Sequence, residues 1–119
     1  MQDKIDRKAK ITALQAGSDH SKNGNPGFDA NFSLLANLAK QAVKDSPDII
    51  VFPEYAISGW PYSSEKAINS LAEPIPADGV WYMRYVNLAR EISTAILGSL
   101  VEERDGKLYN TAFLINPEH

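Results

Sequence analysis

Residues 47–62, PDIIVFPEYAISGWPY, place an acid directly behind an apolar run and follow it with proline, glycine and aromatic residues. The run from Asp48 to Phe52 is rich in β-branched and aromatic side chains, which predicts a strand covered on both faces, as parallel strands in α/β layers are. Ligands of open α/β sheets bind at the carboxyl ends of the strands, because loops converge there. Glu54 follows this strand and is therefore the first candidate for a functional residue.

The residues before this strand predict a second strand, a loop and a helix. Residues 10–16, KITALQA, alternate as a short strand with apolar residues on both faces. Residues 17–28 are crowded with Gly, Asn, Ser and Pro, which is typical of a loop. We expect Asp29 to cap a helix whose apolar positions recur at steps of three and four residues as far as about Asp45. Strand, helix and strand together make a βαβ unit with parallel strands.

The residues after Glu54 predict two helices and a hairpin. Residues 63–73 offer one or two helical turns, and residues 77–91 carry apolar side chains at helical spacing. Residues 93–103 and 107–117 read as strands, and the Asp-Gly pair at 105–106 is typical of a hairpin turn between them. The predicted fold class is α/β.

Composition indicates a globular chain without a nucleic-acid or membrane partner. Of the 119 residues, 44% are hydrophobic, and the net charge is −3 with scattered basic residues. Ile49–Pro53, the longest apolar run, is too short to span a bilayer. The N-terminus lacks the apolar stretch of a signal peptide, so we expect a cytoplasmic protein in which residues 1–9 form a loose extension.

Cysteine and histidine usage limits the chemistry that these residues can supply. The chain contains no cysteine, which excludes disulfides, thiolate metal sites and a thiol nucleophile of its own. It contains two histidines, His20 and His119, and such a pair does not make a histidine-rich metal site. We expect no metal.

Glu54 has two readings. A carboxylate held against an apolar wall becomes a better proton acceptor near neutral pH, because desolvation disfavours its charged form. The commoner role of an acid just beyond a strand is that of a cap, a loop anchor or half of a surface ion pair. Tyr55, Trp60 and Tyr62 supply rigid aromatic surface for a small-molecule pocket, although the same residues also suit an ordinary core.

Several segments together resemble the nitrilase, or carbon-nitrogen hydrolase, superfamily. DIIVFPEYAISGWPY is similar to its first catalytic segment, in which an apolar strand ends in Pro-Glu and is followed by Gly and an aromatic residue. ITALQ resembles the first strand of that family, and Asn31 sits where its first helix commonly carries Asn. AEPIPADG and ILGSLVEERDGKLYNTAFLINPE resemble later segments in the same order. Residues 1–119 are thereby identified as a partial domain of this family.

The resemblance implies the N-terminal half of a four-layer αββα sandwich and a Glu-Lys-Cys triad that hydrolyses nitriles, amides or carbamoyl compounds. In that scheme cysteine attacks the carbon, glutamate relays protons and lysine stabilises negative charge. Glu54 matches the glutamate as general base. The lysine and cysteine of the family come later than the matched segments, so we expect this chain alone to be inactive. The resemblance also implies a homo-oligomer and no metal or organic cofactor.

Neighbouring polar residues are expected to be structural. Ser58, Ser63 and Ser64 lie near Glu54 in sequence, but a carboxylate is a poor activator of a serine hydroxyl. Lys107 precedes the strand that the family's lysine follows, so it does not replace that lysine. We expect a hairpin or ion-pair role for Glu102 or Glu103, a backbone hydrogen bond for Asn110 and a solvated state for His20.

Two other functions compete with the hydrolase. One is a non-catalytic remnant or assembly module that keeps half of the fold and pairs its apolar strands with a related chain. The other is an unrelated flavodoxin-like domain. That reading is weaker because GSDHSKNGNPG, residues 17–27, lacks the spacing of a Gly-rich phosphate loop.

Overall fold

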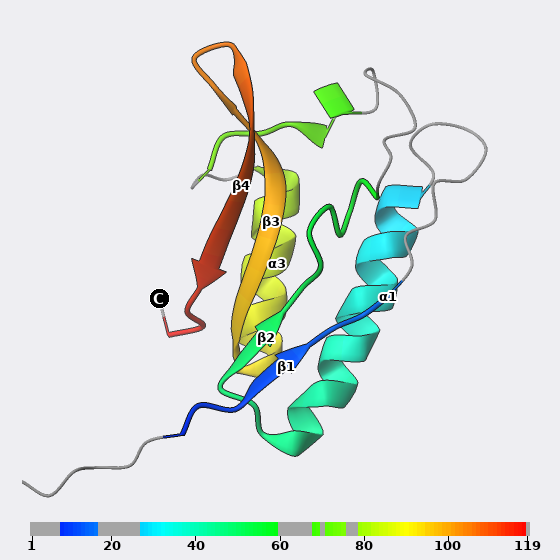
Figure 1. Ribbon diagram of the computed structural model, residues 1–119, viewed down its shortest axis with the longest axis vertical. Coiled ribbons are helices and arrows are strands. Elements are labelled where there is room, and N and C mark those ends of the chain that lie inside the picture. Colours follow the sequence, from blue (N-terminus) through cyan, green and yellow to red (C-terminus); the bar gives the residue numbers. More distant parts are fainter. Residues whose placement is uncertain (1–7, 17–26, 60–67, 70, 76–78, 119) are drawn as a thin grey trace, which may run out of the picture.

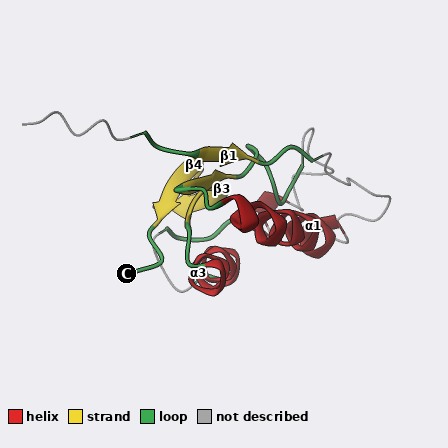
Figure 2. Cartoon of the chain, turned by 90° about the horizontal axis from the view of Figure 1, so that it is seen from below, coloured by secondary structure: helices red, strands yellow, loops and turns green. Residues whose placement is uncertain are grey.

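The structure is a computed structural model that describes residues 8–16, 27–59, 68–69, 71–75 and 79–118. Within this part, a four-stranded sheet of order β1-β2-β3-β4 carries two long helices on one face (Figures 1 and 2). The elements are β1 (Ile11–Ala13), α1 (Gly27–Ala42), β2 (Ile49–Val51), α3 (Val80–Ile92), β3 (Ala95–Arg104) and β4 (Lys107–Ile115). The α/β class is confirmed. Most of the helical turns expected over 63–73, and residues 1–7 of the expected loose extension, lie outside the described residues.

The predicted βαβ unit is confirmed, because β1 and β2 pair in parallel and α1 connects them. The expectation that Asp29 caps α1 is wrong. The helix begins at Gly27, so Asp29 lies in its first turn, where it forms an ion pair with Arg84 of α3. The helix ends as expected near Asp45, since a short 3₁₀ helix (Val43–Asp45) follows it and Ser46 then takes a left-handed conformation with φ 54°.

Tyr85 of α3 forms the centre of the core beneath the sheet. Its side chain is fully buried, and its ring lies 5.4, 5.2 and 5.1 Å from the rings of Phe32, Phe52 and Phe113. Desolvation by burial raises the pKa of the Tyr85 hydroxyl. This hydroxyl has no hydrogen-bond partner among the described residues. Gly98 of β3 allows the close packing, since a Cβ there would lie 2.9 Å from the Tyr85 ring.

The predicted hairpin is confirmed with its two-residue turn. β3 and β4 pair antiparallel, and Arg104 lies opposite Lys107 across Asp105 and Gly106. Both turn residues have positive φ, 53° and 73°, as a type I′ turn requires. This turn fixes which residues of β4 face which side of the sheet.

Glu73 joins the sheet to the start of α3. Its backbone N–H donates to Val101 O at 3.2 Å and its carbonyl accepts from the Glu103 N–H at 2.9 Å, beside the later part of β3. Its buried carboxylate accepts the backbone N–H groups of Trp81 and Tyr82 at 3.1 and 2.5 Å. These N–H groups belong to the first turn of α3, which otherwise leaves them without intrahelical partners. Glu73 therefore positions α3 against β3.

The face of the sheet opposite the helices is apolar and largely uncovered by the described residues (Figure 2). The expectation that β2 is covered on both faces is wrong for this part of the chain: Ile50 is buried, but Ile49 and Val51 are half-buried. The side chains of Ile11, Leu97 and Leu114 on this face are 60%, 36% and 60% exposed. We call this surface the open sheet face. In the described residues, no helix is long and apolar enough to cross a membrane.

Candidate functional site

Glu54 lies at the carboxyl end of β2, where the chain leaves the sheet. The Phe52 N–H still donates to Leu97 O at 2.9 Å, and the chain turns from Glu54 onward. The Glu54 side chain is exposed. It lines, together with neighbouring residues, a pocket of about 260 Å³ beside the open sheet face. The pocket is lined by Phe52, Glu54, Leu97, Ser99, Asn110 and Ala112. Its walls combine apolar side chains with a carboxylate, a hydroxyl and an amide, as in many small-molecule sites.

Asn110 of β4 holds the Glu54 carboxylate. The Asn110 Nδ2 donates to Glu54 Oε1 at 2.7 Å, a good hydrogen-bond distance. The expectation that the Asn110 side chain bonds backbone is therefore wrong. The alternation of β4 contains the signal that was missed, because Asn110, Ala112 and Leu114 share one face of that strand. This is the face on which the chain leaves β2.

The turn that carries Glu54 is fixed at several points. Tyr55 adopts a left-handed conformation with φ 54°, which is uncommon for a residue other than glycine. Its carbonyl accepts the Gly59 N–H at 2.7 Å. The buried Asn31 of α1 donates from Nδ2 to Ile57 O at 2.8 Å. The hydrogen bond from Asn31 thus helps to keep the turn in the strained conformation seen at Tyr55. Strained backbone that the surrounding structure stabilises is common at functional sites.

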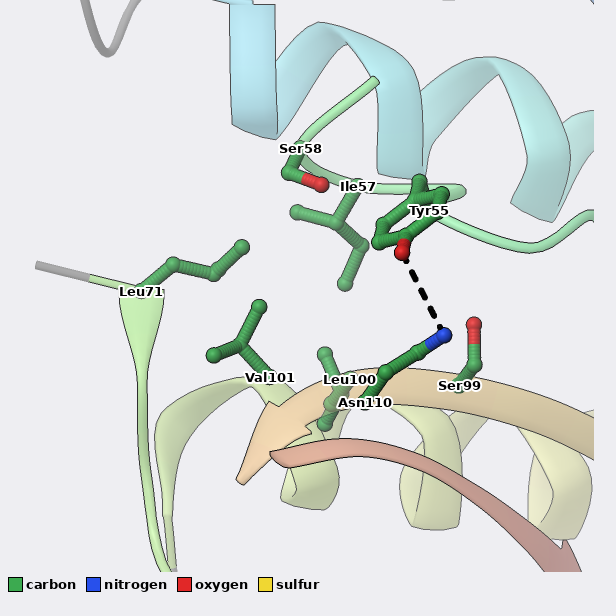
Figure 3. A pocket seen from close by; sticks show the side chains of 8 residues that line it. All are labelled: Tyr55, Ile57, Ser58, Leu71, Ser99, Leu100, Val101 and Asn110. Carbon is green, nitrogen blue, oxygen red and sulfur yellow. Dashed lines mark hydrogen bonds between the residues drawn. The ribbon is translucent and has the colours of Figure 1, made fainter. Parts of the chain in front are cut away.

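A second, smaller cavity lies between this turn and the sheet (Figure 3). Its volume is about 10 Å³, close to the least that holds a water molecule. Figure 3 shows Asn110 and Ser99 projecting from the strands toward Tyr55, whose hydroxyl lies 3.4 Å from Asn110 Nδ2. The Ser99 Oγ is buried without a hydrogen-bond partner among the described residues. Ser99 lines both this cavity and the pocket beside Glu54.

The aromatic wall suggested by the sequence is described only in part. Tyr55 lines the small cavity rather than the pocket beside Glu54, and its contact with a substrate stays a prediction. Trp60, Tyr62, Ser63, Ser64 and His20 lie outside the described residues.

Two other polar residues, Ser58 and Glu102, have structural partners. Ser58 is buried, and its Oγ donates to Gly59 O at 3.3 Å. Glu102 is buried and accepts a hydrogen bond at 2.8 Å from Thr111 Oγ1 across the hairpin. Lys107 is exposed beside the hairpin turn.

In the part of the chain that the structure describes, no group of three or more His, Cys, Asp or Glu side chains is arranged to hold a metal ion.

Comparison with known proteins places these features in one family. A family model described as carbon-nitrogen hydrolase matches residues 10–119. The chain is 35% identical over 88 residues to Hydrolase C26A3.11 of Schizosaccharomyces pombe, covering 73% of this chain and 26% of that protein. It is 32% identical over 92 residues to the protein N-terminal amidase of Saccharomyces cerevisiae, covering 73% and 19%. For omega-amidase NIT2 of Bos taurus the identity is 33% over 89 residues, covering 74% and 30%.

Solved structures show the same fold. A crystal structure of an N-terminal amidase superposes with a TM-score of 0.73 at 23% identity, covering 92% of this chain and 26% of that one. XC1258 from Xanthomonas campestris gives a TM-score of 0.70 at 22% identity, covering 92% and 37%. The chain therefore spans about a quarter to a third of the matched structures, and its sheet and helices correspond to part of a nitrilase-like fold.

Proposed function

The chain belongs to the carbon-nitrogen hydrolase family, and we propose that the whole protein hydrolyses a non-peptide carbon-nitrogen bond with Glu54 as its general base. One observation carries the assignment to this residue. The Glu54 carboxylate stands at the end of β2, beside a pocket, and a side chain from a different strand holds one of its oxygens. A surface acid with a capping or ion-pair role does not need such an arrangement, whereas a general base must be held within reach of its proton.

The proposed reaction divides the work between this chain and residues outside it. Glu54 takes the proton of a cysteine thiol, whose sulfur bonds to the substrate carbon. With an amide or a carbamoyl compound, Glu54 then gives that proton to the leaving nitrogen as the carbon-nitrogen bond breaks, and water releases the acyl group from sulfur. With a nitrile, the proton goes to the nitrogen of the thioimidate that forms, and ammonia leaves after water attacks its carbon. These 119 residues contain no cysteine, so the nucleophile must come from elsewhere in the whole protein. By themselves they should not turn over substrate.

We propose a small-molecule amide, carbamoyl compound or nitrile as substrate. The names of similar proteins, among them an omega-amidase and a nitrilase, support this range. The pocket beside Glu54 is small, about 260 Å³, and the apolar side chains of Leu97 and Ala112 in its wall suit the non-polar part of such a molecule. A homo-oligomeric, cytoplasmic enzyme without metal or organic cofactor remains the prediction for the whole protein.

The replacement Glu54→Gln tests this assignment, because it keeps the shape of the side chain and removes its proton-accepting charge. Ammonia release from a panel of primary amides, carbamoyl compounds and nitriles should fall by at least about 10²-fold in the whole protein. Glu103→Gln is the matched control, since Glu103 is exposed on the neighbouring strand and is not among the residues that line the pocket. Turnover retained by Glu54→Gln would overturn the assignment.

The assembly module remains the second candidate, and the open sheet face supports it. Its apolar surface suits a partner as well as it suits further residues of the same protein. Sequencing the gene beyond codon 119 separates the two functions. A reading frame that continues through a lysine and then a cysteine segment supports the hydrolase, whereas a stop codon directly after His119 supports the module.

A further inference from the structure

We propose that Asn110 is a positioning residue that assigns different tasks to the two oxygens of Glu54; this inference rests on the function proposed above. Its amide nitrogen lies 2.7 Å from Glu54 Oε1. Among the described residues, Glu54 Oε2 accepts no comparable hydrogen bond. Oε1 is therefore the anchored oxygen, and Oε2 is the one that exchanges the proton.

A neutral amide suits a carboxyl group that must cycle between two protonation states. An amide N–H donates to Oε1 both when Glu54 is ionised and when it carries a proton on Oε2, because the anchored oxygen is an acceptor in both states. A lysine or arginine at this place would favour the ionised form strongly and would oppose the return of the proton. Asn110 therefore holds the orientation of Glu54 through the whole proposed cycle.

The backbone around Glu54 and Tyr55 is shaped for this contact. Consecutive side chains of an extended chain point to opposite sides, yet Asn110 Nδ2 lies 2.7 Å from Glu54 Oε1 and 3.4 Å from the Tyr55 hydroxyl. The left-handed conformation at Tyr55 marks the departure from extended backbone that places both groups beside one nitrogen. Asn110 itself lies on a long, regularly paired strand, opposite Val101, which gives the donor a fixed position.

Two near-isosteric replacements separate this role from a structural one in the whole protein. Asn110→Leu removes the donor and should lower kcat by about 10–100-fold with little change in KM, since positioning errors act mainly on the reacting geometry. Asn110→Asp puts two carboxyl groups side by side. When the pair shares one proton, the new carboxyl group can donate to Oε1 as the amide did, and when both ionise they repel.

The diagnostic measurement is the ratio of kcat for Asn110→Asp to kcat for Asn110→Leu as a function of pH. We expect this ratio to exceed one in acid and to fall by about tenfold or more as the pH rises. The same exchanges at Asn37, exposed on α1, serve as controls and should leave kcat unchanged. Melting temperatures show whether the variants fold.

The outcomes distinguish this inference from the proposed function. If Glu54→Gln is inactive while both Asn110 variants keep the wild-type kcat, or while their ratio does not depend on pH, the positioning role is overturned and the hydrolase assignment stands. If Glu54→Gln retains turnover, the hydrolase assignment itself fails.

Discussion

Gly79 lies so close to Glu73 that a side chain at Gly79 would overlap the Glu73 carboxylate: a Cβ there would be 2.5 Å from Glu73 Cδ. The φ of Gly79 is −60°, which other residues adopt readily, so lack of space and not backbone conformation calls for glycine. The absence of a side chain at the start of α3 allows the carboxylate of Glu73 to reach the first N–H groups of that helix.

The replacement Gly79→Ala should therefore lower the free energy of unfolding by about 1–3 kcal/mol, because it displaces a buried acceptor from two N–H donors. Urea denaturation measures the change. In a Glu73→Ala background the same replacement should cost much less, since the carboxylate it collides with is gone. An equal cost in both backgrounds would contradict this explanation.

Asn31 should stabilise the turn that carries Glu54. The replacement Asn31→Ala removes the 2.8 Å bond to Ile57 O and leaves that buried carbonyl without its donor, a loss of about 1–3 kcal/mol. Amide hydrogen exchange at Ile57 and Gly59 should accelerate. Asn37→Ala on the exposed side of the same helix is the control and should change stability by less than about 0.5 kcal/mol.

Tyr85 should make stability depend on alkaline pH. Burial raises the pKa of its hydroxyl in the folded protein, so the unfolded chain loses this proton first, near its ordinary value of about 10. Above that pH the unfolded state is favoured, and the free energy of unfolding should fall by about 1.4 kcal/mol per pH unit from this group. Below about pH 10, the contribution of Tyr85 to the free energy of unfolding does not change with pH.

The variant Tyr85→Phe isolates this effect, because it keeps the ring and removes the hydroxyl that lacks a partner among the described residues. At neutral pH its stability should equal or exceed that of the wild type. Above pH 10 it should lose less stability than the wild type. A clear loss of stability at neutral pH would show that the hydroxyl has a partner.

The open sheet face should drive association of the 119-residue chain when it is produced by itself. Exposed apolar patches of this kind are sites of contact between proteins. Replacing Leu97 and Leu114 together by lysine should reduce the weight-average mass measured by analytical ultracentrifugation. Leu34→Lys, at a 46% exposed position on α1 away from the sheet, should leave it unchanged. Equal association of all the variants would assign the contact to another surface.

Local patterns were sufficient for much of the fold. The parallel strands, the connecting helix and the Asp105-Gly106 turn all follow from periodicity or turn chemistry within a few residues. Asp29 misled because an acid is favoured both at a cap and in the first turn of a helix, so its presence does not set the first residue. Whether both faces of β2 are buried depends on what packs on the open sheet face. The local sequence pattern of β2 does not contain that information.

Of the residues at the candidate site, only Glu54 could be predicted from the sequence. Glu54 follows an apolar strand, a signal contained in the adjacent residues. Asn110 is 56 positions away, and its contact depends on how β4 is paired. Glu73 caps α3 from eight and nine residues upstream, well beyond the spacing of the usual capping motifs, so its role also emerges only from the tertiary structure.

The length of the turn at Asp105 and Gly106 has a consequence for the distant carboxylate. Because side chains alternate along a strand, one residue inserted into this turn with β3 left in place would shift β4 by one position and present Tyr109 to Glu54 in place of Asn110. The length of the hairpin turn, which does not itself line the pocket, thus determines whether the Asn110 amide lies opposite Glu54. A single insertion or deletion at this tip should therefore remove the amide from Glu54, whereas an insertion balanced by a deletion should keep it there.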